Sequence, residues 1–293
     1  MTSTDPATEL SAARGDHYSK SANPQVWWDA HFQDAVGAVL DYFGGDGISL
    51  TGKRVADIGC GDGIIDLGVA LTAKPDRMVG FDIQTTDVEL LAQRAKEHIG
   101  LAELPGNLFF ATSDELYLPA EDASFDYVMS WSAFEHIADP AAVLREVRRI
   151  LVDEGVLFIQ LWPFYHAAHG THLVDWYPDG FAQFKHSNAD IVRTVRAAGP
   201  PEMAAEMLEV YRTLNGITAD ELQLALWRAG FRIVKVALDA ESVHIPDEAA
   251  HLPLSTVAIS GIKLLAVKTD PTDGPPPSRS ALDRPAAEST ADA

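Results

Sequence analysis

The chain has 293 residues, of which 47% are hydrophobic and 22% are charged, so it can bury the core of one large domain. Acidic residues outnumber basic ones 43 to 22, and the net charge of −21 disfavours binding to nucleic acid or to anionic membrane surfaces. The single cysteine, Cys60, excludes an intrachain disulfide. We expect a cytoplasmic protein without membrane insertion, since there is no signal-peptide pattern and no run of about 20 apolar residues.

The first half of the chain alternates between helical and β-rich patterns. Residues 1–16 are polar and predicted to be disordered, and 17–45 carry apolar residues at helical spacing that end at Gly44-Gly45. Short β-rich runs then alternate with helical segments, as in a parallel sheet with crossover helices. We expect strands at 54–58, 78–82, 108–111, 125–130 and 155–160, and helices at 64–73, 88–99 and 140–151.

The second half begins with a long segment that lacks a regular pattern. Residues 162–214 are predicted to be an insertion after the fifth strand, with a helical region near 190–214, and such segments are usually functional lids. Thr218 and Glu221 form a capping box that opens a helix ending at Gly230. Strands at 231–238 and 257–267 complete the sheet. The tail, 270–293, is rich in Pro, Ser and Ala and is predicted to be disordered.

A glycine-rich turn with acidic side chains follows the first strand. Its pattern is D-x-G-x-G-x-G, made by Asp57, Gly59, Gly61 and Gly63. Glycines at a strand-to-helix turn adopt positive φ and let a ligand approach the backbone closely. The turn therefore predicts a ligand-binding loop at the carboxyl end of the first strand.

The spacing of this loop discriminates between ligands. The dinucleotide pattern G-x-G-x-x-G fails, because Ile64 and Asp66 stand where it needs glycine. The loop contains carboxylates and no lysine or arginine, which favours a cationic ligand over a pyrophosphate. Asp82 lies nineteen residues after the last loop glycine, at the end of the second strand, where an acid can accept both ribose hydroxyls. Together these features predict S-adenosylmethionine, which carries a sulfonium, an ammonium and no phosphate.

These residues resemble class I S-adenosylmethionine-dependent methyltransferases, in particular the ubiquinone- and menaquinone-biosynthesis-like group that modifies small molecules. The resemblance covers residues 54–160 and 214–236, and it includes the acid-to-proline segment 113–119 and the helix pattern at 144–151. It implies a Rossmann-like, doubly wound α/β fold over 17–269. The seven-stranded sheet would be mostly parallel with an antiparallel last strand, and the domain would carry an N-terminal helical segment (17–45) and a lid (162–214).

The resemblance also implies which side chains contact the cofactor. The acid that matches Asp114 takes the adenine amino group, and the backbone N–H of the next residue, Glu115, meets the ring. The complete set of expected cofactor residues is Asp57, Gly59, Gly61, Gly63, Asp82, Ile83, Asp114, Glu115 and Ser130.

Glu135, His136 and His172 are the catalytic candidates. Methyl transfer is an in-line displacement that depends on positioning, and a hydroxyl nucleophile also gains from a base. Glu135-His136 follows the fourth strand and faces the reaction cavity in the family, whereas His136 as a plain helix-start residue is the alternative. His172 is the first choice within the lid.

The lid histidines also have a spacing that could suggest a metal. His166, His169, His172 and Asp175 recur every three residues, but Gly170 and a preceding proline argue against a regular helix that aligns them. We therefore predict no metal site and expect these histidines to line a substrate pocket.

The sequence favours O-methylation of a small molecule over several other functions. C- or N-methylation of a small molecule, protein methylation and a non-catalytic S-adenosylmethionine-binding module remain alternatives. Amino-group methyltransferases of nucleic acids carry an Asn/Asp-Pro-Pro-aromatic motif after the fourth strand, where this chain reads Met129-Ser-Trp-Ser-Ala133. We expect no nucleic-acid partner, and the oligomeric state stays open.

Overall fold

Seven strands pair into one twisted sheet in the computed structural model, which describes residues 23–269. The predicted disordered segments 1–16 and 270–293, and residues 17–22 of the helical segment, lie outside the described residues. The strands are β1 (Arg54–Ile58), β2 (Arg77–Asp82), β3 (Leu108–Thr112), β4 (Phe125–Trp131), β5 (Leu151–Leu161), β6 (Phe231–Ala240) and β7 (Ile259–Lys268).

The order of the strands confirms the predicted doubly wound fold. It runs β3-β2-β1-β4-β5-β7-β6, and only β7 is antiparallel to its neighbours. The order reverses between β1 and β4, which pair directly, with Asp57 opposite Met129. Ligands of open α/β sheets bind at such a reversal, outside the carboxyl ends of the strands.

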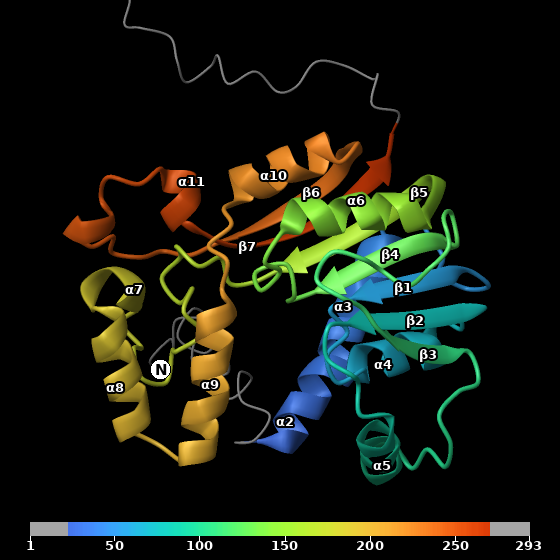
Figure 1. Ribbon diagram of the computed structural model, residues 1–293, viewed down its shortest axis with the longest axis horizontal. Helices are drawn as coiled ribbons and strands as arrows, with labels where there is room; N and C mark the ends of the chain where they lie inside the picture. The colour runs from blue at the N-terminus through green and yellow to red at the C-terminus, as the bar shows by residue number, and fades with distance from the viewer. Residues whose placement is uncertain (1–22, 270–293) are drawn as a thin grey trace, which may run out of the picture.

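Helices cover both faces of the sheet (Figure 1). The central strands are buried on both faces, and four of the five residues of β1 are buried. One face packs against α6 and α10 through residues such as Leu144, Val147 and Leu226, and the other packs against α3 and α4 through Val39 and Val69. The four helices that cover the sheet are α3 (Val36–Gly44), α4 (Ile64–Thr72), α6 (Pro140–Ile150) and α10 (Ala219–Arg228). Two others, α2 (Pro24–Asp29) and α5 (Val88–Ile99), lie further out.

The N-terminal helical segment packs against α4 at close range. It consists of α2, a π-helical stretch η2 (Ala30–Ala35) and α3, and it ends at Gly44 as predicted. A Cβ on Gly68 of α4 would lie 2.4 Å from Val36 Cγ2 and 3.2 Å from the carbonyl oxygen of Phe32. The missing side chain at position 68 is therefore what lets these two helical segments approach each other.

The 162–214 insertion differs from its prediction. The helical region expected near 190–214 is divided into α8 (Asn188–Ala197) and α9 (Pro201–Thr213), preceded by the short α7 (Ala182–Lys185). The division has a local cause: Gly199 has φ +108° and two prolines follow, neither of which continues a helix. The insertion buries an apolar cluster of its own that includes Leu173, Ile191 and Met207.

Two smaller differences concern the ends of strands. β5 begins at Leu151 rather than at residue 155, and an irregularity in its pairing with β4 accommodates the extra residues. β7 begins at Ile259, because the preceding residues form the short helix α11 (Leu254–Val257) after a 3-10 turn, η3 (Asp247–Ala249).

Within residues 23–269, no helix has the length and apolarity needed to cross a membrane.

The contact at Gly68 yields a stability prediction. Gly68→Ala should lower the free energy of unfolding by about 1–3 kcal/mol, because the new methyl group overlaps Val36. Gly37→Ala is the matched control: it also lies in a helix, no atom lies within 4 Å of where its Cβ would stand, and it should gain about 0.5–1 kcal/mol. Urea denaturation measures both, and equal stability of the two variants would contradict the close packing at Gly68.

Candidate functional site

The glycine loop lies at the carboxyl end of β1 and is shaped by three positive φ angles. They are +79° at Gly59, +53° at Gly61 and +76° at Gly63. A Cβ on Gly59 would lie 2.3 Å from Ala133 Cβ, and one on Gly63 would lie 2.5 Å from the Phe110 ring. Gly61 has nothing within 4 Å of that position. Packing therefore requires glycine at 59 and 63, whereas Gly61 leaves open space for a ligand.

Asp82 joins this loop to the end of β2. Its Oδ2 accepts the N–H of Gly61 at 2.9 Å, and its Oδ1 accepts the N–H of Gln84 at 2.9 Å. Thr86 Oγ1 donates to the carbonyl oxygen of Gly61 at 3.1 Å. The side chain of Asp82 thus lies beside the loop, and each of its carboxylate oxygens keeps a further lone pair for another donor. Its contact with ribose hydroxyls stays a prediction.

Buried acids lie beneath the loop. Asp57 is 2% exposed, and its Oδ1 has no hydrogen-bond partner among the described residues. Burial, with the charge of Asp82 as the second cause, raises the pKa of Asp57 to about 8. Burial and the neighbouring Asp57 raise the pKa of Asp66, on α4, well above the usual carboxyl value. A positive ligand charge near the loop would favour the ionised form of these acids.

Asp66 is a residue that sequence reasoning missed. Its signal was present, since it is the one acid in the apolar helix Ile64–Thr72 and is fully buried there. Charged residues are almost never fully buried unless they are paired or functional.

Burial also raises the pKa of the nearby Cys60 thiol, which keeps this cysteine unreactive.

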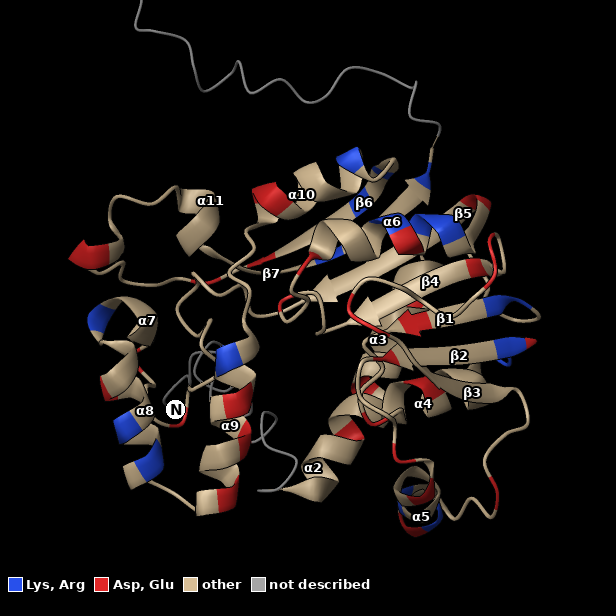
Figure 2. Cartoon of the chain, viewed as in Figure 1, with Lys and Arg blue, Asp and Glu red and all other residues tan. Residues whose placement is uncertain are grey.

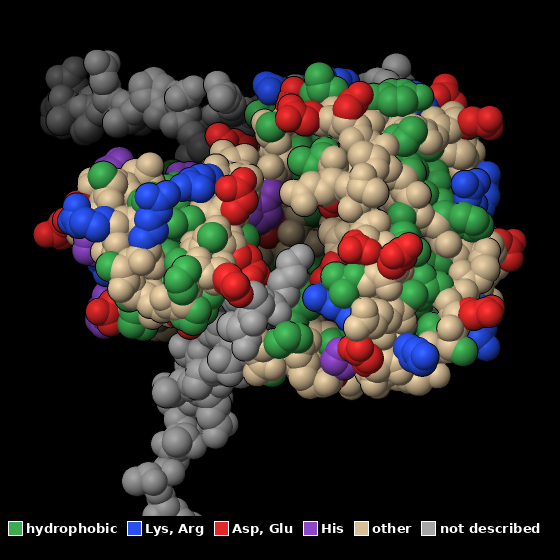
Figure 3. Space-filling model, turned by 60° about the horizontal axis from the view of Figure 1, so that its bottom comes forward, with side chains coloured by type: hydrophobic (Ala, Val, Ile, Leu, Met, Phe, Trp, Pro, Cys, Tyr) green, Lys and Arg blue, Asp and Glu red, His purple; other side chains and the backbone are tan. Residues whose placement is uncertain are grey.

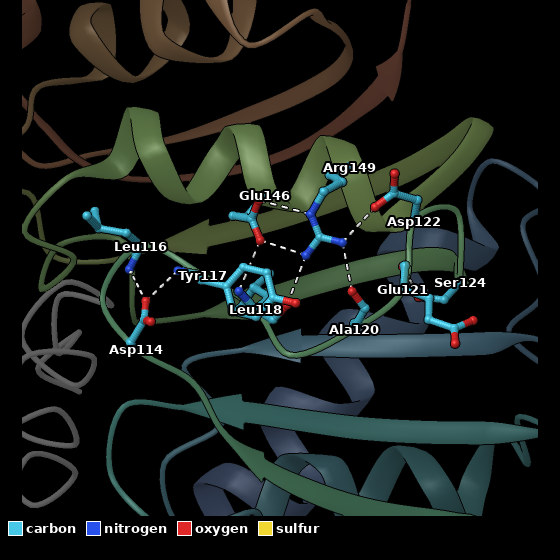
Figure 4. A network of polar contacts seen from close by, with 10 residues as sticks. All are labelled: Asp114, Leu116, Tyr117, Leu118, Ala120, Glu121, Asp122, Ser124, Glu146 and Arg149. Carbon is cyan, nitrogen blue, oxygen red and sulfur yellow. Dashed lines mark hydrogen bonds and ion pairs between the residues drawn. The ribbon is translucent and has the colours of Figure 1, made fainter.

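Asp114 holds a turn of its own backbone. Its Oδ1 accepts the N–H of Leu116 at 2.8 Å and of Tyr117 at 2.6 Å (Figure 4). Both Asp114 and Glu115 are exposed. The turn leaves Oδ2 of Asp114 available, and its contact with an adenine amino group stays a prediction.

Arg149 anchors the segment that follows Asp114 (Figure 4). Its guanidinium donates to the carbonyl oxygens of Leu118 at 2.9 Å and Ala120 at 2.7 Å, and it pairs with Glu146 at 2.7 Å and Asp122 at 2.9 Å. Glu146 in turn accepts the N–H of Leu118 at 3.1 Å. The two family-like segments, 113–119 and 144–151, are thus parts of one network that fixes the loop after β3.

Ser130 and Ile83 occupy very different environments. Ser130 is fully buried, and its hydroxyl donates to the carbonyl oxygen of Ile58 at 2.8 Å, which ties β4 to β1. Ile83, directly after Asp82, is 60% exposed. Ile83 therefore offers an apolar surface to a ligand, whereas the side chain of Ser130 serves the sheet; a cofactor contact at either residue stays a prediction.

Glu135, His136 and His172 come together although 36 residues separate the two histidines. One ligand atom from each of the three lies within 4.8 Å of the others, and the two imidazole centroids are 5.6 Å apart. Glu135 is 2% and His172 is 7% exposed. Figure 3 shows the insertion as a separate lobe, divided from the sheet lobe by a furrow with histidine and acidic side chains on its walls.

The turn that carries Glu135 and His136 is clamped by Asn215. Its Nδ2 donates to the carbonyl oxygens of Phe134 at 2.7 Å and Ile137 at 2.8 Å. Its backbone N–H donates to the carbonyl oxygen of Glu135 at 2.8 Å. Asn215 follows α9, so the end of the insertion fixes the turn after β4. Nothing in the sequence pattern identified this asparagine, because its role depends on contacts with residues about 80 positions away.

Burial sets the protonation of the three grouped side chains. It raises the pKa of Glu135 to about 8 and lowers that of His136 to about 4. Burial, followed by the nearby His136, lowers the pKa of His172 to about 3. At pH 7 both imidazoles are therefore neutral, so each has a nitrogen lone pair that can accept a proton or bind a cation.

The other histidines of the insertion lie elsewhere. His169 Nε2 contacts the carbonyl oxygen of Pro178 at 3.1 Å, and His169 Nδ1 lies 3.6 Å from Glu241. His166 packs edge-on against Tyr165. The three-residue spacing of these histidines therefore does not produce a common site. Over residues 23–269, the one set of three His, Cys, Asp or Glu ligand atoms with metal-like spacing is Glu135, His136 and His172.

Comparison with known proteins places this site in a family. A family model described as a methyltransferase domain matches residues 28–236. The chain is 29% identical over 200 residues to malonyl-[acyl-carrier protein] O-methyltransferase of Geobacter sulfurreducens, covering 68% of this chain and 63% of that protein. It is 26% identical over 152 residues to ubiquinone biosynthesis O-methyltransferase of Pasteurella multocida, covering 49% and 61%. The match thus spans about three fifths of these relatives' own length.

Two solved structures share the fold. The [4+2]-cyclase SpnF superposes with a TM-score of 0.51 at 18% identity, covering 81% of this chain and 82% of SpnF. YcgJ from Bacillus subtilis superposes with a TM-score of 0.50 at 17% identity, covering 81% and 99%. At these identities the likeness establishes the fold alone, and the cyclase illustrates that one fold hosts several reactions.

The Asn215 clamp gives a second stability prediction. Asn215→Ala removes both donors from the buried turn and should lower the free energy of unfolding by about 1–3 kcal/mol. Asn188→Ala, at an exposed position on α8, should change it by less than about 0.5 kcal/mol. Chemical denaturation compares the two, and a neutral Asn215→Ala would show that the clamp does not hold the turn.

Proposed function

The chain belongs to the methyltransferase-domain family, and on this premise we propose that it transfers the methyl group of S-adenosylmethionine to a hydroxyl oxygen of a small molecule. One observation carries the proposal: the glycine loop and the Glu135–His136–His172 group lie at the same edge of the sheet. Gly59 packs closely against Ala133, two residues before Glu135, so the loop adjoins the turn that carries Glu135 and His136. The donor loop and a cluster of proton-accepting groups are thus neighbours.

The loop residues suit a cationic adenosyl cofactor. The open space at Gly61 admits a ligand, and the buried Asp57 Oδ1 has no hydrogen-bond partner among the described residues, so the loop favours positive charge. S-adenosylmethionine supplies an electrophilic methyl group on a sulfonium. Asp82 would accept the ribose hydroxyls, Asp114 the adenine amino group, and Ile83 would pack against the ring.

The histidines would act on the methyl acceptor. Both imidazoles are neutral, with His172 buried and His136 half-buried, so either can hold the hydroxyl and receive its proton as the oxygen attacks. The rest of the rate enhancement would come from alignment and from exclusion of water. We assign that role to the 162–214 insertion, which carries His172 and would cover the acceptor as a lid.

Oxygen is favoured as the attacked atom for two reasons. A hydroxyl gains more from a neighbouring proton acceptor than a carbon or an amine lone pair does, and this site holds two. The relatives named above are O-methyltransferases, and a further one, 27-O-demethylrifamycin SV methyltransferase of Amycolatopsis mediterranei, is 31% identical over 134 residues. An enclosed site suits a small acceptor better than a protein.

A panel assay tests the proposed function. The chain is incubated with methyl-labelled S-adenosylmethionine and small phenols, catechols, hydroxy acids and carboxylic acids, and mass spectrometry with NMR locates the label. We expect the label on oxygen. A label on carbon or nitrogen would establish the runner-up reactions. Intact binding of S-adenosylhomocysteine without any product from the panel or from a metabolite extract would indicate a binding module.

Asp82→Ala tests the cofactor site. The variant leaves the ribose hydroxyls poorly matched and loses the contacts to Gly61 and Gln84, so S-adenosylhomocysteine should bind about 2–4 kcal/mol more weakly. Glu89→Ala, exposed in the first turn of α5, is the control and should bind normally. Calorimetry gives both values, and unchanged affinity in Asp82→Ala would refute the ribose assignment.

His136→Ala and His172→Ala test the proton acceptor. Each variant should lower kcat by about 10²–10⁴-fold and leave the affinity for S-adenosylhomocysteine unchanged. His169→Ala is the control within the same insertion, because its ring contacts the carbonyl oxygen of Pro178 instead. Full activity in both test variants would leave positioning as the sole catalytic device.

A further inference from the structure

The Glu135–His136–His172 group has the composition of a metal site as well as that of an acid–base cluster. Two imidazoles and one carboxylate are a common donor set for Zn²⁺ and other divalent transition metals. In a tetrahedral site with bonds of about 2.0–2.1 Å, the ligand atoms lie about 3.3 Å apart. The three side chains are within 4.8 Å of one another, so small side-chain rotations suffice to close around an ion.

The carboxylate of Glu135 is the strongest pointer to a cation. The residue is 2% exposed, and neither carboxylate oxygen has a hydrogen-bond partner among the described residues. A carboxyl group that is removed from water without a hydrogen bond is costly in either protonation state. His136 and His172 lie next to it, so an ion placed between the three would offset that cost and hold both imidazoles.

His136 is oriented in the manner of a metal-bound histidine. The Thr213 hydroxyl lies 3.0 Å from the carbonyl oxygen of Val210 and 2.8 Å from His136 Nδ1. When the hydroxyl donates to the carbonyl oxygen, it accepts the Nδ1–H of His136, and Nε2 of His136 keeps the lone pair. Histidines that ligate metals almost always donate their other ring N–H to a nearby acceptor, and Thr213 supplies that acceptor.

His172 enters the group from a strained backbone. It has φ +61°, in the left-handed region that residues other than glycine rarely adopt, and its N–H donates to the carbonyl oxygen of His169 at 3.1 Å. Such residues persist only when the surroundings hold them, and they concentrate at ligand sites. The turn thus directs His172 to the buried position beside His136.

We propose that Glu135, His136 and His172 together bind one divalent transition-metal ion, for which Zn²⁺ matches the donor set best. Three protein ligands leave one coordination position, as in metal sites that bind water or a substrate oxygen. An imidazole whose lone pair binds the ion does not accept a proton, so with the ion bound the two histidines hold the ion in place of acting as proton acceptors. Mg²⁺ is a poorer match because it prefers oxygen ligands. The sequence predicts no metal, because the only ligand set it offers by spacing is His166, His169, His172 and Asp175, which Gly170 and a preceding proline keep from aligning on a helix. The inference goes beyond the proposed function, since ion binding is measured without methyl transfer.

Direct metal titration tests the proposal. The full chain is treated with a chelator, dialysed, and titrated with Zn²⁺ in a calorimeter and with Co²⁺ while visible absorption is recorded. We expect about one ion per chain and the intense visible bands of four- or five-coordinate Co²⁺, which Zn²⁺ abolishes by displacement. Glu135→Gln and His172→Ala should weaken binding by about 100-fold or more, and Thr213→Val by about 10–100-fold. The exposed His244→Ala is the control and should bind as the wild type does.

Three results would overturn the proposal: no stoichiometric binding, a Co²⁺ spectrum like that of the hydrated ion, or equal affinity in wild type, Glu135→Gln and His172→Ala. If a variant fails to fold, the wild-type stoichiometry and spectrum decide alone. A chain that binds the ion and transfers no methyl group contradicts the proposed function and keeps this inference. A chain that transfers methyl groups and binds no ion supports the proposed function and overturns this inference.

Discussion

The pairing of β1 with β4 is the constraint on which the site depends. Chain order reverses at this pair, so the loops after both strands diverge from one edge and leave room between them. The hydrogen bond from Ser130 to the carbonyl oxygen of Ile58 and the contact of Gly59 with Ala133 hold the two strand ends in register. A shift of either strand would separate the cofactor loop from the Glu135 turn, so the geometry of the reaction is set by backbone pairing.

Charged side chains are also distributed unevenly along the direction of the strands. Figure 2 shows basic side chains at the amino ends of β1 and β2 and acidic ones toward their carboxyl ends, as Arg54 and Asp57 illustrate on β1. Arg54 is neutralised locally by Asp126 at 2.8 Å, whereas within residues 23–269 no basic side chain pairs with Asp57 or Asp66 beneath the glycine loop. Burial raises the pKa of both acids, and a cation placed at the carboxyl edge would favour their ionised forms and be attracted to them. This matches a sulfonium donor and disfavours phosphate-bearing cofactors.

Local pattern sufficed for the features that depend on neighbouring residues. The strands β1 to β4 and the positive φ angles of Gly59, Gly61 and Gly63 follow from apolar runs and turn chemistry, so the sequence predicted them. The sequence did not predict the break at Gly199, where prolines override a helical pattern, or the burial of Asp66. The meeting of Glu135 with His172 also escaped prediction, because it depends on how the insertion packs and on the Asn215 clamp. Spacing along the chain carries no information about such contacts.

The separate apolar cluster of the 162–214 insertion has a consequence for how this protein can change over generations. Residues such as Ile191 and Met207 pack among themselves rather than into the sheet's cores, so substitutions there leave the strands undisturbed. In the proposed function, the residues that would hold the methyl donor lie at the end of the sheet, and the insertion would form one wall of the acceptor side. Selection could then remodel acceptor preference by altering the insertion, while the residues proposed to hold the methyl donor are inherited unchanged.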